Sequence, residues 1–133
     1  MYLDMYLTGN KYLFAGLDGR SSDVLEDGYR LRNKDLELGY WYNHPRLHKF
    51  ITQRFSDGEY RMHLIELNVE AIHEIIHTIQ NNNLPEAPEL SGVPEAQSSV
   101  DPKYCVDTFL AALKWLQTSD DLHWRAIHYQ ATW

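Results

Sequence analysis

The stretch LELGYWYNHPRLHKFITQRF, residues 36–55, contains two kinds of periodicity and decides the fold class. Residues 36–42 are mostly aromatic and apolar, as expected of a β-strand. Asn43 or His44 then begins a helix, with Pro45 in its first turn, where a missing amide hydrogen removes no intrahelical hydrogen bond. A strand that runs directly into a helix predicts a mixed fold.

The same periodicities predict further elements on both sides of that stretch. Strands are expected at residues 2–7, 11–16, 60–67 and 123–133. Asn68 and Asp101 are good N-cap residues for two more helices. The apolar stripes of these two helices are Val69, Ile72, Ile76 and Ile79, and Val106, Phe109, Leu110, Leu113 and Leu116. The order of elements predicts an α+β domain, with a small, mainly antiparallel sheet of about four strands and three helices packed on it.

The length of 133 residues suits one domain, so we expect residues 1–133 to form a single unit. Residues 17–35 and 81–102 are rich in Gly, Pro, Asp, Asn and Ser, and each predicts a long surface loop or a mobile hairpin. No apolar run is long enough to span a bilayer. The first residues lack the basic and apolar segments of a signal peptide, so we expect a cytoplasmic chain without membrane association.

The chain is acidic, with a formal net charge of −7 that resides entirely in residues 62–133. This charge opposes unaided attraction to nucleic acid or to anionic lipid. Basic side chains crowd the middle of the first half: Arg30, Arg32, Lys34, Arg46, Lys49, Arg54 and Arg61. If the fold gathers them on one face they form a local positive patch, and otherwise they are ordinary surface charges.

The segment His73-Glu74-Ile75-Ile76-His77 matches the motif H-E-x-x-H, in which two histidines bind zinc and the glutamate acts as a base. The apolar stripe of the same helix places both histidines on its flank or toward water. The sequence signals no third ligand. Two solvent-flanking histidines are therefore the favoured interpretation, and we expect no metal and no cofactor.

Aromatic and basic side chains around the strand-to-helix junction form the candidate binding site. On a strand, Tyr40 and Tyr42 share one face and Trp41 takes the other. Aromatic rings beside Arg46 can stack a base or hold a partner's side chain. Packing in the core explains the same rings as well. The candidate binding residues are Tyr40, Trp41, Tyr42, His44, Arg46, His48 and Trp133.

Five blocks spread along the chain carry a resemblance. These blocks are MYLDMYL (1–7), GYWYNHPRLH (39–48), LP (84–85), ALKWL (112–116) and YQATW (129–133). They resemble a family of small proteins of phages and their bacterial hosts, which begin M-G-x-D-M-Y-L, carry G-Y-W-R-K-x-x-x-x-H and end Y-x-[AS]-S-W. By this resemblance Tyr40, Trp41, His48 and Trp133 match the family pattern. Tyr42-Asn43 stands where the family has Arg-Lys, and residues 91–94 (SGVP) stand where it has an aromatic G-F-F-F-G.

Three classes of function follow. Small size, polarised charge and the lack of a complete catalytic set favour a phage-type accessory protein, not an enzyme, that binds a host or phage protein in the host cytoplasm. The first alternative is a small-molecule or nucleotide binder with an aromatic and histidine pocket. The second is a zinc-dependent hydrolase that uses His73, Glu74 and His77. A protein partner is thus expected, and nucleic acid only through a basic patch within residues 30–61.

Overall fold

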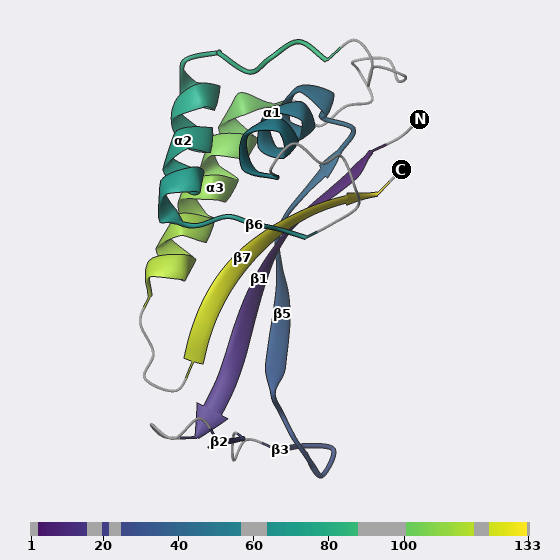
Figure 1. Ribbon diagram of the computed structural model, residues 1–133, viewed down its shortest axis with the longest axis vertical. Coiled ribbons are helices and arrows are strands. Elements are labelled where there is room, and N and C mark those ends of the chain that lie inside the picture. Colours follow the sequence, from purple (N-terminus) through teal and green to yellow (C-terminus); the bar gives the residue numbers. More distant parts are fainter. Residues whose placement is uncertain are drawn as a thin grey trace.

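The long strand β1 (Asp4–Ala15) is the centre of the sheet in the computed structural model of the chain (Figure 1). The structure describes residues 3–15, 20–21, 25–56, 64–87, 101–118 and 123–132. β1 pairs antiparallel with β5 on one side and with β7 on the other, and β7 pairs antiparallel with the short β6. The end of β1 also pairs with β2. The bounds are Asn33–Tyr42 for β5, His123–Thr132 for β7, Ile65–Glu66 for β6 and Arg20–Ser21 for β2.

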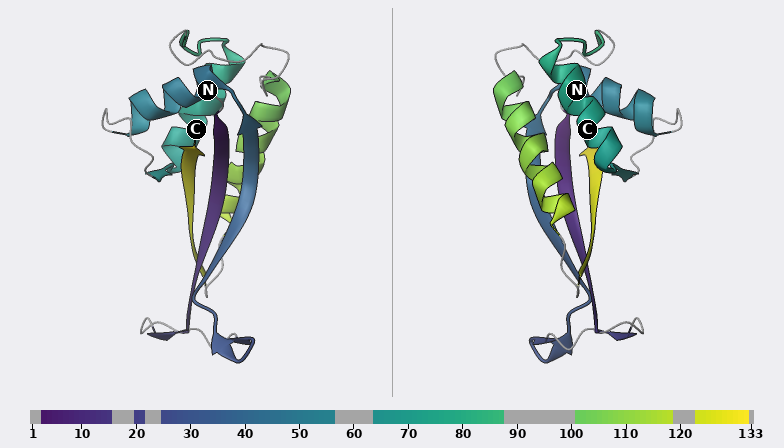
Figure 2. Two further views of the ribbon diagram at one scale, coloured as in Figure 1. Left: turned by 90° about the vertical axis from the view of Figure 1, so that its right-hand side faces the viewer. Right: turned by 90° about the vertical axis from the view of Figure 1, so that its left-hand side faces the viewer.

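Three helices lie against one face of this sheet (Figure 2). They are α1 (Pro45–Phe55), α2 (Val69–Gln80) and α3 (Pro102–Gln117). The side chains of His44, Asn68 and Asp101 each accept a hydrogen bond from an amide of the first turn, so every helix begins where the sequence predicts. The α+β class is therefore confirmed. Among the described residues, no helix is both long enough and apolar enough to cross a bilayer.

Strand alternation divides β1 into two sides. Leu3, Met5 and Leu7 are fully buried against the helices. Asp4 and Tyr6 alternate with them and are half-buried on the side that faces away from the helices, which we call the outer face. Because directly opposed residues of an antiparallel pair share a face, the register of β5 and β7 assigns their residues to the same two sides.

The prediction of two separate strands at residues 2–7 and 11–16 is wrong, because β1 continues through Gly9 without a turn. A Cβ atom at Gly9 would lie 2.8 Å from Cη2 of Trp115 and 2.9 Å from Cδ1 of Leu38. The glycine therefore makes room for the Trp115 ring of α3. Close packing, and not chain reversal, explains its place in the strand.

Of the two alternatives predicted for residues 17–35, a surface loop or a hairpin, the described residues contain a hairpin. β3 (Leu25–Glu26) and β4 (Tyr29–Arg30) form a small hairpin, and β5 already begins at Asn33. Asp27 and Gly28 connect the hairpin with φ values of 51° and 84°, which suits the tight turn that Asp-Gly favours. This hairpin stands at the end of the sheet that lies away from the helices (Figures 1 and 2).

Two other predicted elements are described only in part. Of the strand expected at residues 60–67, the described part starts at Leu64, and Ile65–Glu66 pairs with β7. Of the loop expected at residues 81–102, residues 88–100 lie outside the described part of the chain.

The expected stripe of α3 is wrong at Leu110, which is 46% exposed. The buried residues of α3 are Cys105, Thr108, Phe109, Ala112 and Leu113. The buried side of α3 includes Thr108 in place of Leu110, because α3 approaches β5 at Gly39. A Cβ atom at Gly39 would lie 2.5 Å from Cγ2 of Thr108.

Candidate functional site

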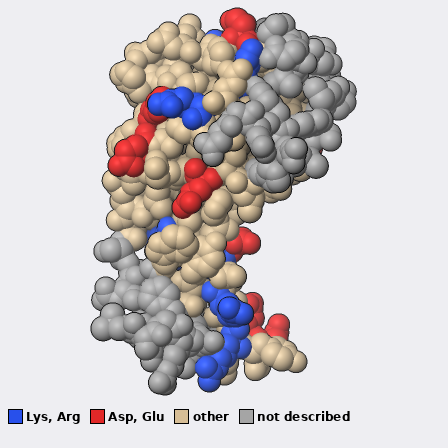
Figure 3. All heavy atoms as spheres, viewed as in Figure 1, with Lys and Arg blue, Asp and Glu red and all other residues tan. Residues whose placement is uncertain are grey.

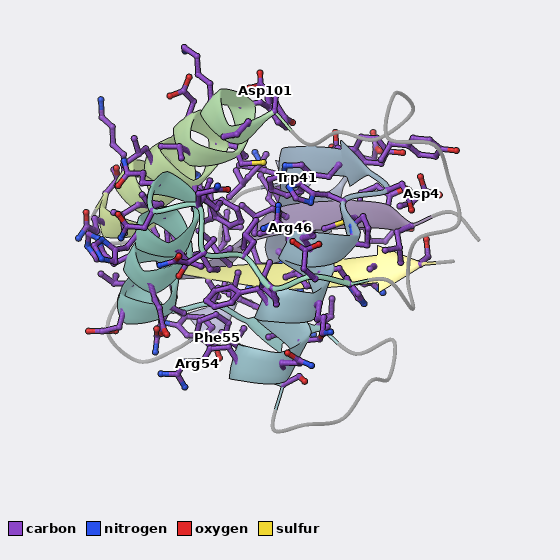
Figure 4. The ribbon with its side chains drawn as sticks, turned by 90° about the horizontal axis from the view of Figure 1, so that it is seen from above. Asp4, Trp41, Arg46, Arg54, Phe55 and Asp101 are labelled. Carbon is purple, nitrogen blue, oxygen red and sulfur yellow. The ribbon has the colours of Figure 1, made fainter. Side chains whose placement is uncertain are left out.

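Trp41 faces the helices and belongs to the core. Its ring stacks on Phe109 with 5.3 Å between centroids and 20° between planes. The indole N–H donates to Sγ of Cys105 at 3.2 Å. Burial raises the pKa of the Cys105 thiol to about 11, which keeps the sulfur protonated and unreactive at neutral pH. Of the predicted binding residues, Trp41 is thus fully committed to packing (Figure 4).

The chain turns from β5 into α1 at Asn43, whose φ of 56° lies in the left-handed region. The Asn43 amide donates to the Leu3 carbonyl at 2.6 Å, so the turn is tied to the start of the sheet. His44 follows as the N-cap, and its Nδ1 accepts from the Leu47 amide at 3.4 Å. Burial, followed by the nearby Arg46 charge, lowers the pKa of His44 to about 4. His44 is therefore neutral at pH 7 and serves the helix start.

His48 lies under the sheet on the helix side. Its Nδ1 shares a hydrogen bond of 2.7 Å with the hydroxyl of Tyr129 on β7. Burial lowers the pKa of His48 to about 4 and raises the pKa of Tyr129 well above its ordinary value. Both groups are neutral at pH 7 and nearly inaccessible to solvent. Their contact fastens α1 to the sheet.

Arg46 reaches from α1 to a distant loop. Its guanidinium donates to the carbonyl oxygens of Leu84 at 2.6 Å and Pro85 at 3.2 Å. It also lies 3.9 Å from the carboxylate of Glu86. Lys49, one turn later, donates to the Glu86 carbonyl at 2.8 Å. These basic groups hold the segment after α2 against α1.

Tyr40 and Tyr42 lie on the outer face, together with Tyr6 and Asp4 of β1. The register pairs Asp4 with Tyr42 and Tyr6 with Tyr40. The Tyr40 hydroxyl donates to Oδ1 of Asp4 at 2.5 Å, and the rings of Tyr6 and Tyr40 are 5.2 Å apart. This hydrogen bond, with burial second, raises the pKa of Tyr40 to about 12. We call Tyr6, Tyr40 and Tyr42 the tyrosine cluster.

The predicted site residues therefore separate into two groups. Trp41, His44 and His48 lie on the helix side of the sheet, whereas the tyrosine cluster lies on the outer face, and Arg46 contacts a loop. Trp133 lies outside the described residues. Asp4 and Tyr6 were not among the predicted site residues. The alternation of polar and apolar side chains in residues 3–8 is the signal that places them beside Tyr40 and Tyr42.

The histidines of the H-E-x-x-H segment are exposed on α2. Nε2 of His77 shares a hydrogen bond of 2.9 Å with Nδ2 of the Asn81 side chain. Oε1 of Glu74 accepts from Nε of Arg54 at 2.7 Å. Within the described ranges, no group of three or more His, Cys, Asp or Glu side chains is placed so that it could hold a metal ion. The exposure of His73 and His77 agrees with the predicted position of both histidines on the flank of the helix.

The basic residues of the first half lie in two places. Arg30, Arg32 and Lys34 lie at the hairpin end of β5, and Arg46, Lys49 and Arg54 lie on α1 beyond its other end. From Lys34 to Tyr42, β5 extends about 27 Å at about 3.4 Å per residue. Arg61 lies outside the described part. The described basic residues thus do not form one patch.

Comparison of the chain with protein-family models, with curated protein sequences and with solved structures finds no match. The resemblance to the phage and bacterial family therefore stays a prediction from the five blocks.

Proposed function

We propose that this chain is a phage-type accessory protein without catalytic activity, which binds a host or phage protein in the cytoplasm of the infected cell. The observation that carries the proposal is the tyrosine cluster on the outer face. Tyrosine combines a large contact area with a hydroxyl that forms hydrogen bonds, and it is enriched at the energetic centres of protein interfaces. Tyr40 is held in place by Asp4, so its ring is already ordered before a partner binds.

The burial of His44 and His48 supports a binding protein over an enzyme. A general acid or base must reach its substrate and needs a pKa near the working pH. His44 and His48 are buried, with pKa values lowered to about 4, and both bind atoms of the protein itself. Arg46 is occupied by the carbonyls of Leu84 and Pro85. The pocket of the first alternative function would therefore lack its histidines and its arginine.

The proposal is tested by affinity capture from phage-infected cells, with mass spectrometry of the bound proteins. The wild-type chain is compared with the double variant Tyr40→Ser/Tyr42→Ser. Tyr29→Ser is the matched control, because Tyr29 is an exposed tyrosine on the hairpin, away from the cluster. We expect one protein to be enriched by the wild type and by the control, and to be lost with the double variant.

The captured protein is then purified, and its affinity for the three chains is measured by calorimetry. Loss of two interface tyrosines is expected to weaken binding by a factor of at least ten. Equal affinity for the wild type and the double variant would remove the tyrosine cluster from the interface. Enrichment of no protein, together with a measurable enzymatic activity, would refute the proposed function.

A further inference from the structure

The outer face of the sheet carries no helix in the described part of the chain. In the left view of Figure 2, β5, β1 and β7 lie side by side in front, and the helices lie behind them. The side chains of the outer face are therefore open to a partner, and their charges and rings determine which partner the face can accept.

One row of residues crosses the outer face and ends in a carboxylate on each side. Thr8 continues the outward alternation of β1, and it pairs with Glu37 of β5 and with His128 of β7. His128 in turn pairs with Glu66 of β6. Three steps of about 4.8 Å between strands place the backbones of Glu37 and Glu66 about 14 Å apart. Both side chains are exposed, and neither forms an ion pair with a described residue.

The cationic side chains of the same strands point to the helix side. Lys11 of β1 pairs in register with Lys34 and with Arg125, and Arg125 donates to the Trp115 carbonyl of α3 at 2.8 Å. Among the described residues of β1, β5, β6 and β7, no lysine or arginine therefore faces outward. Figure 3 likewise shows large Lys and Arg groups toward the two ends of the molecule and Asp and Glu side chains between them. The outer face of the sheet is thus negative.

Aromatic rings lie at both ends of the outer face. The tyrosine cluster occupies the end near the start of β1. At the other end the rings of Tyr12 and Trp124 are 4.9 Å apart, and Trp124 is 56% exposed. From Tyr6 to Tyr12, β1 extends about 20 Å at about 3.4 Å per residue. An extended segment of about seven residues would therefore reach the rings at both ends and pass the carboxylates between them.

A chain of hydrogen bonds orders the middle of the outer face. Nδ2 of Asn10 donates to Oδ1 of Asp35 at 2.6 Å, and Oδ1 of Asn10 shares a hydrogen bond of 2.5 Å with Nδ1 of His128. Since an amide oxygen only accepts, Nδ1 of His128 carries the hydrogen atom. The chain joins β5, β1 and β7, so these side chains are fixed before a partner binds, which lowers the entropic cost of binding.

We propose that the outer face binds an arginine-rich segment of the protein partner, which lies along β1 between the tyrosine cluster and Trp124. The guanidinium group is planar and always charged, so it forms ion pairs with carboxylates such as Glu37 and Glu66 and also stacks on aromatic rings. Nucleic acid and acidic proteins are repelled by a negative face. The inference rests on the proposed function, because it names the chemistry of the partner that the tyrosine cluster binds.

The probe is a rhodamine-labelled octa-arginine peptide, and its binding is measured by fluorescence anisotropy at low salt. The double variant Glu37→Gln/Glu66→Gln removes two carboxylates from the outer face and is expected to bind the peptide about five-fold more weakly. The matched control, Glu70→Gln/Glu86→Gln, removes two exposed carboxylates from α2 and the segment after it, so the net charge changes equally. The control is expected to keep the wild-type affinity.

Salt and a second peptide separate charge from stacking. Raising the salt from about 0.05 M to about 1 M shortens the Debye length to about 3 Å, so the difference between the wild type and Glu37→Gln/Glu66→Gln is expected to disappear. Octa-arginine is expected to bind the wild type several-fold more tightly than octa-lysine, because only the guanidinium stacks as a plane. This preference is expected to be reduced in Tyr40→Ser/Tyr42→Ser and retained in Tyr29→Ser.

The inference is overturned if Glu70→Gln/Glu86→Gln weakens peptide binding as much as Glu37→Gln/Glu66→Gln does, or if octa-arginine does not bind at low salt. The protein captured from infected cells is measured with the same variants. If it is lost with Tyr40→Ser/Tyr42→Ser but binds Glu37→Gln/Glu66→Gln with the wild-type affinity, the proposed function stands and the arginine-rich partner is refuted. If no protein is captured, the proposed function fails, and the peptide measurements still decide whether the face recognises arginine.

Discussion

Acidification from pH 7 to pH 5 is expected to destabilise this protein strongly, because His44 and His48 are buried in their neutral forms. Their pKa values are lowered to about 4, mainly by burial, whereas the unfolded chain has the ordinary value of 6.5. Below pH 6.5 both histidines therefore bind protons in the unfolded state, while they remain unprotonated in the folded state. Stability is complete above pH 6.5 and falls as the pH approaches 4.

The size of the effect follows from these pKa values. Between pH 7 and pH 5, each histidine is expected to remove about 2 kcal/mol from the free energy of unfolding, so the two together remove about 4 kcal/mol. A domain of this size has a total stability of roughly 5–15 kcal/mol. The loss is thus a large fraction of the whole, and it occurs before most carboxylates titrate.

The assay is urea unfolding at a series of pH values, followed by tryptophan fluorescence. His48→Gln is expected to reduce the loss between pH 7 and pH 5 to about half, because one of the two proton-linked groups is gone. His73→Gln is the matched control at an exposed position of α2, and it is expected to keep the wild-type profile. A loss below about 1 kcal/mol in the wild type would refute the assignment of two buried neutral histidines.

Three other predictions concern packing, the outer face and α2. Gly9→Ala is expected to lower the free energy of unfolding by about 1–3 kcal/mol, because the added methyl group meets Trp115; an unchanged melting temperature would contradict this account. Asp4→Asn is expected to lower the pKa of Tyr40 from about 12 toward 10, measured by ultraviolet titration, and a pKa that stays near 12 would show that Asp4 is not the cause. His77→Ala is expected to change stability by less than about 0.5 kcal/mol. Atomic absorption of untagged protein is expected to find no stoichiometric zinc, and bound zinc that is lost in this variant would revive the hydrolase hypothesis.

Local sequence signals predicted the helices well. Asn68 and Asp101 cap their helices as expected, and Pro45 occupies the first turn of α1. These signals act within one helical turn, where a side chain reaches an amide two or three residues away. Alternation likewise separated Trp41 from its neighbours on β5, because the side-chain period of a strand is two residues.

The predictions were wrong where a residue's position is set by packing against a distant element and not by its neighbours in the sequence. Residues 2–7 and 11–16 were predicted as two strands, yet Gly9 between them accommodates Trp115 of α3 within a continuous strand. Leu110 belonged to the expected apolar stripe, yet it is exposed, because α3 turns Thr108 toward Gly39. In both cases an element that lies far along the chain sets the requirement.

By itself the sequence determined the α+β class, the helix starts and the side-chain alternation of the strands, since these depend on neighbours a few residues apart. Only the tertiary structure decided which side chains meet. His48 bonds to Tyr129, 81 positions away, and Lys11 faces Lys34 and Arg125 because β1 lies between β5 and β7. Strand order and register depend on the packing of the whole chain, and no short stretch of sequence contains them.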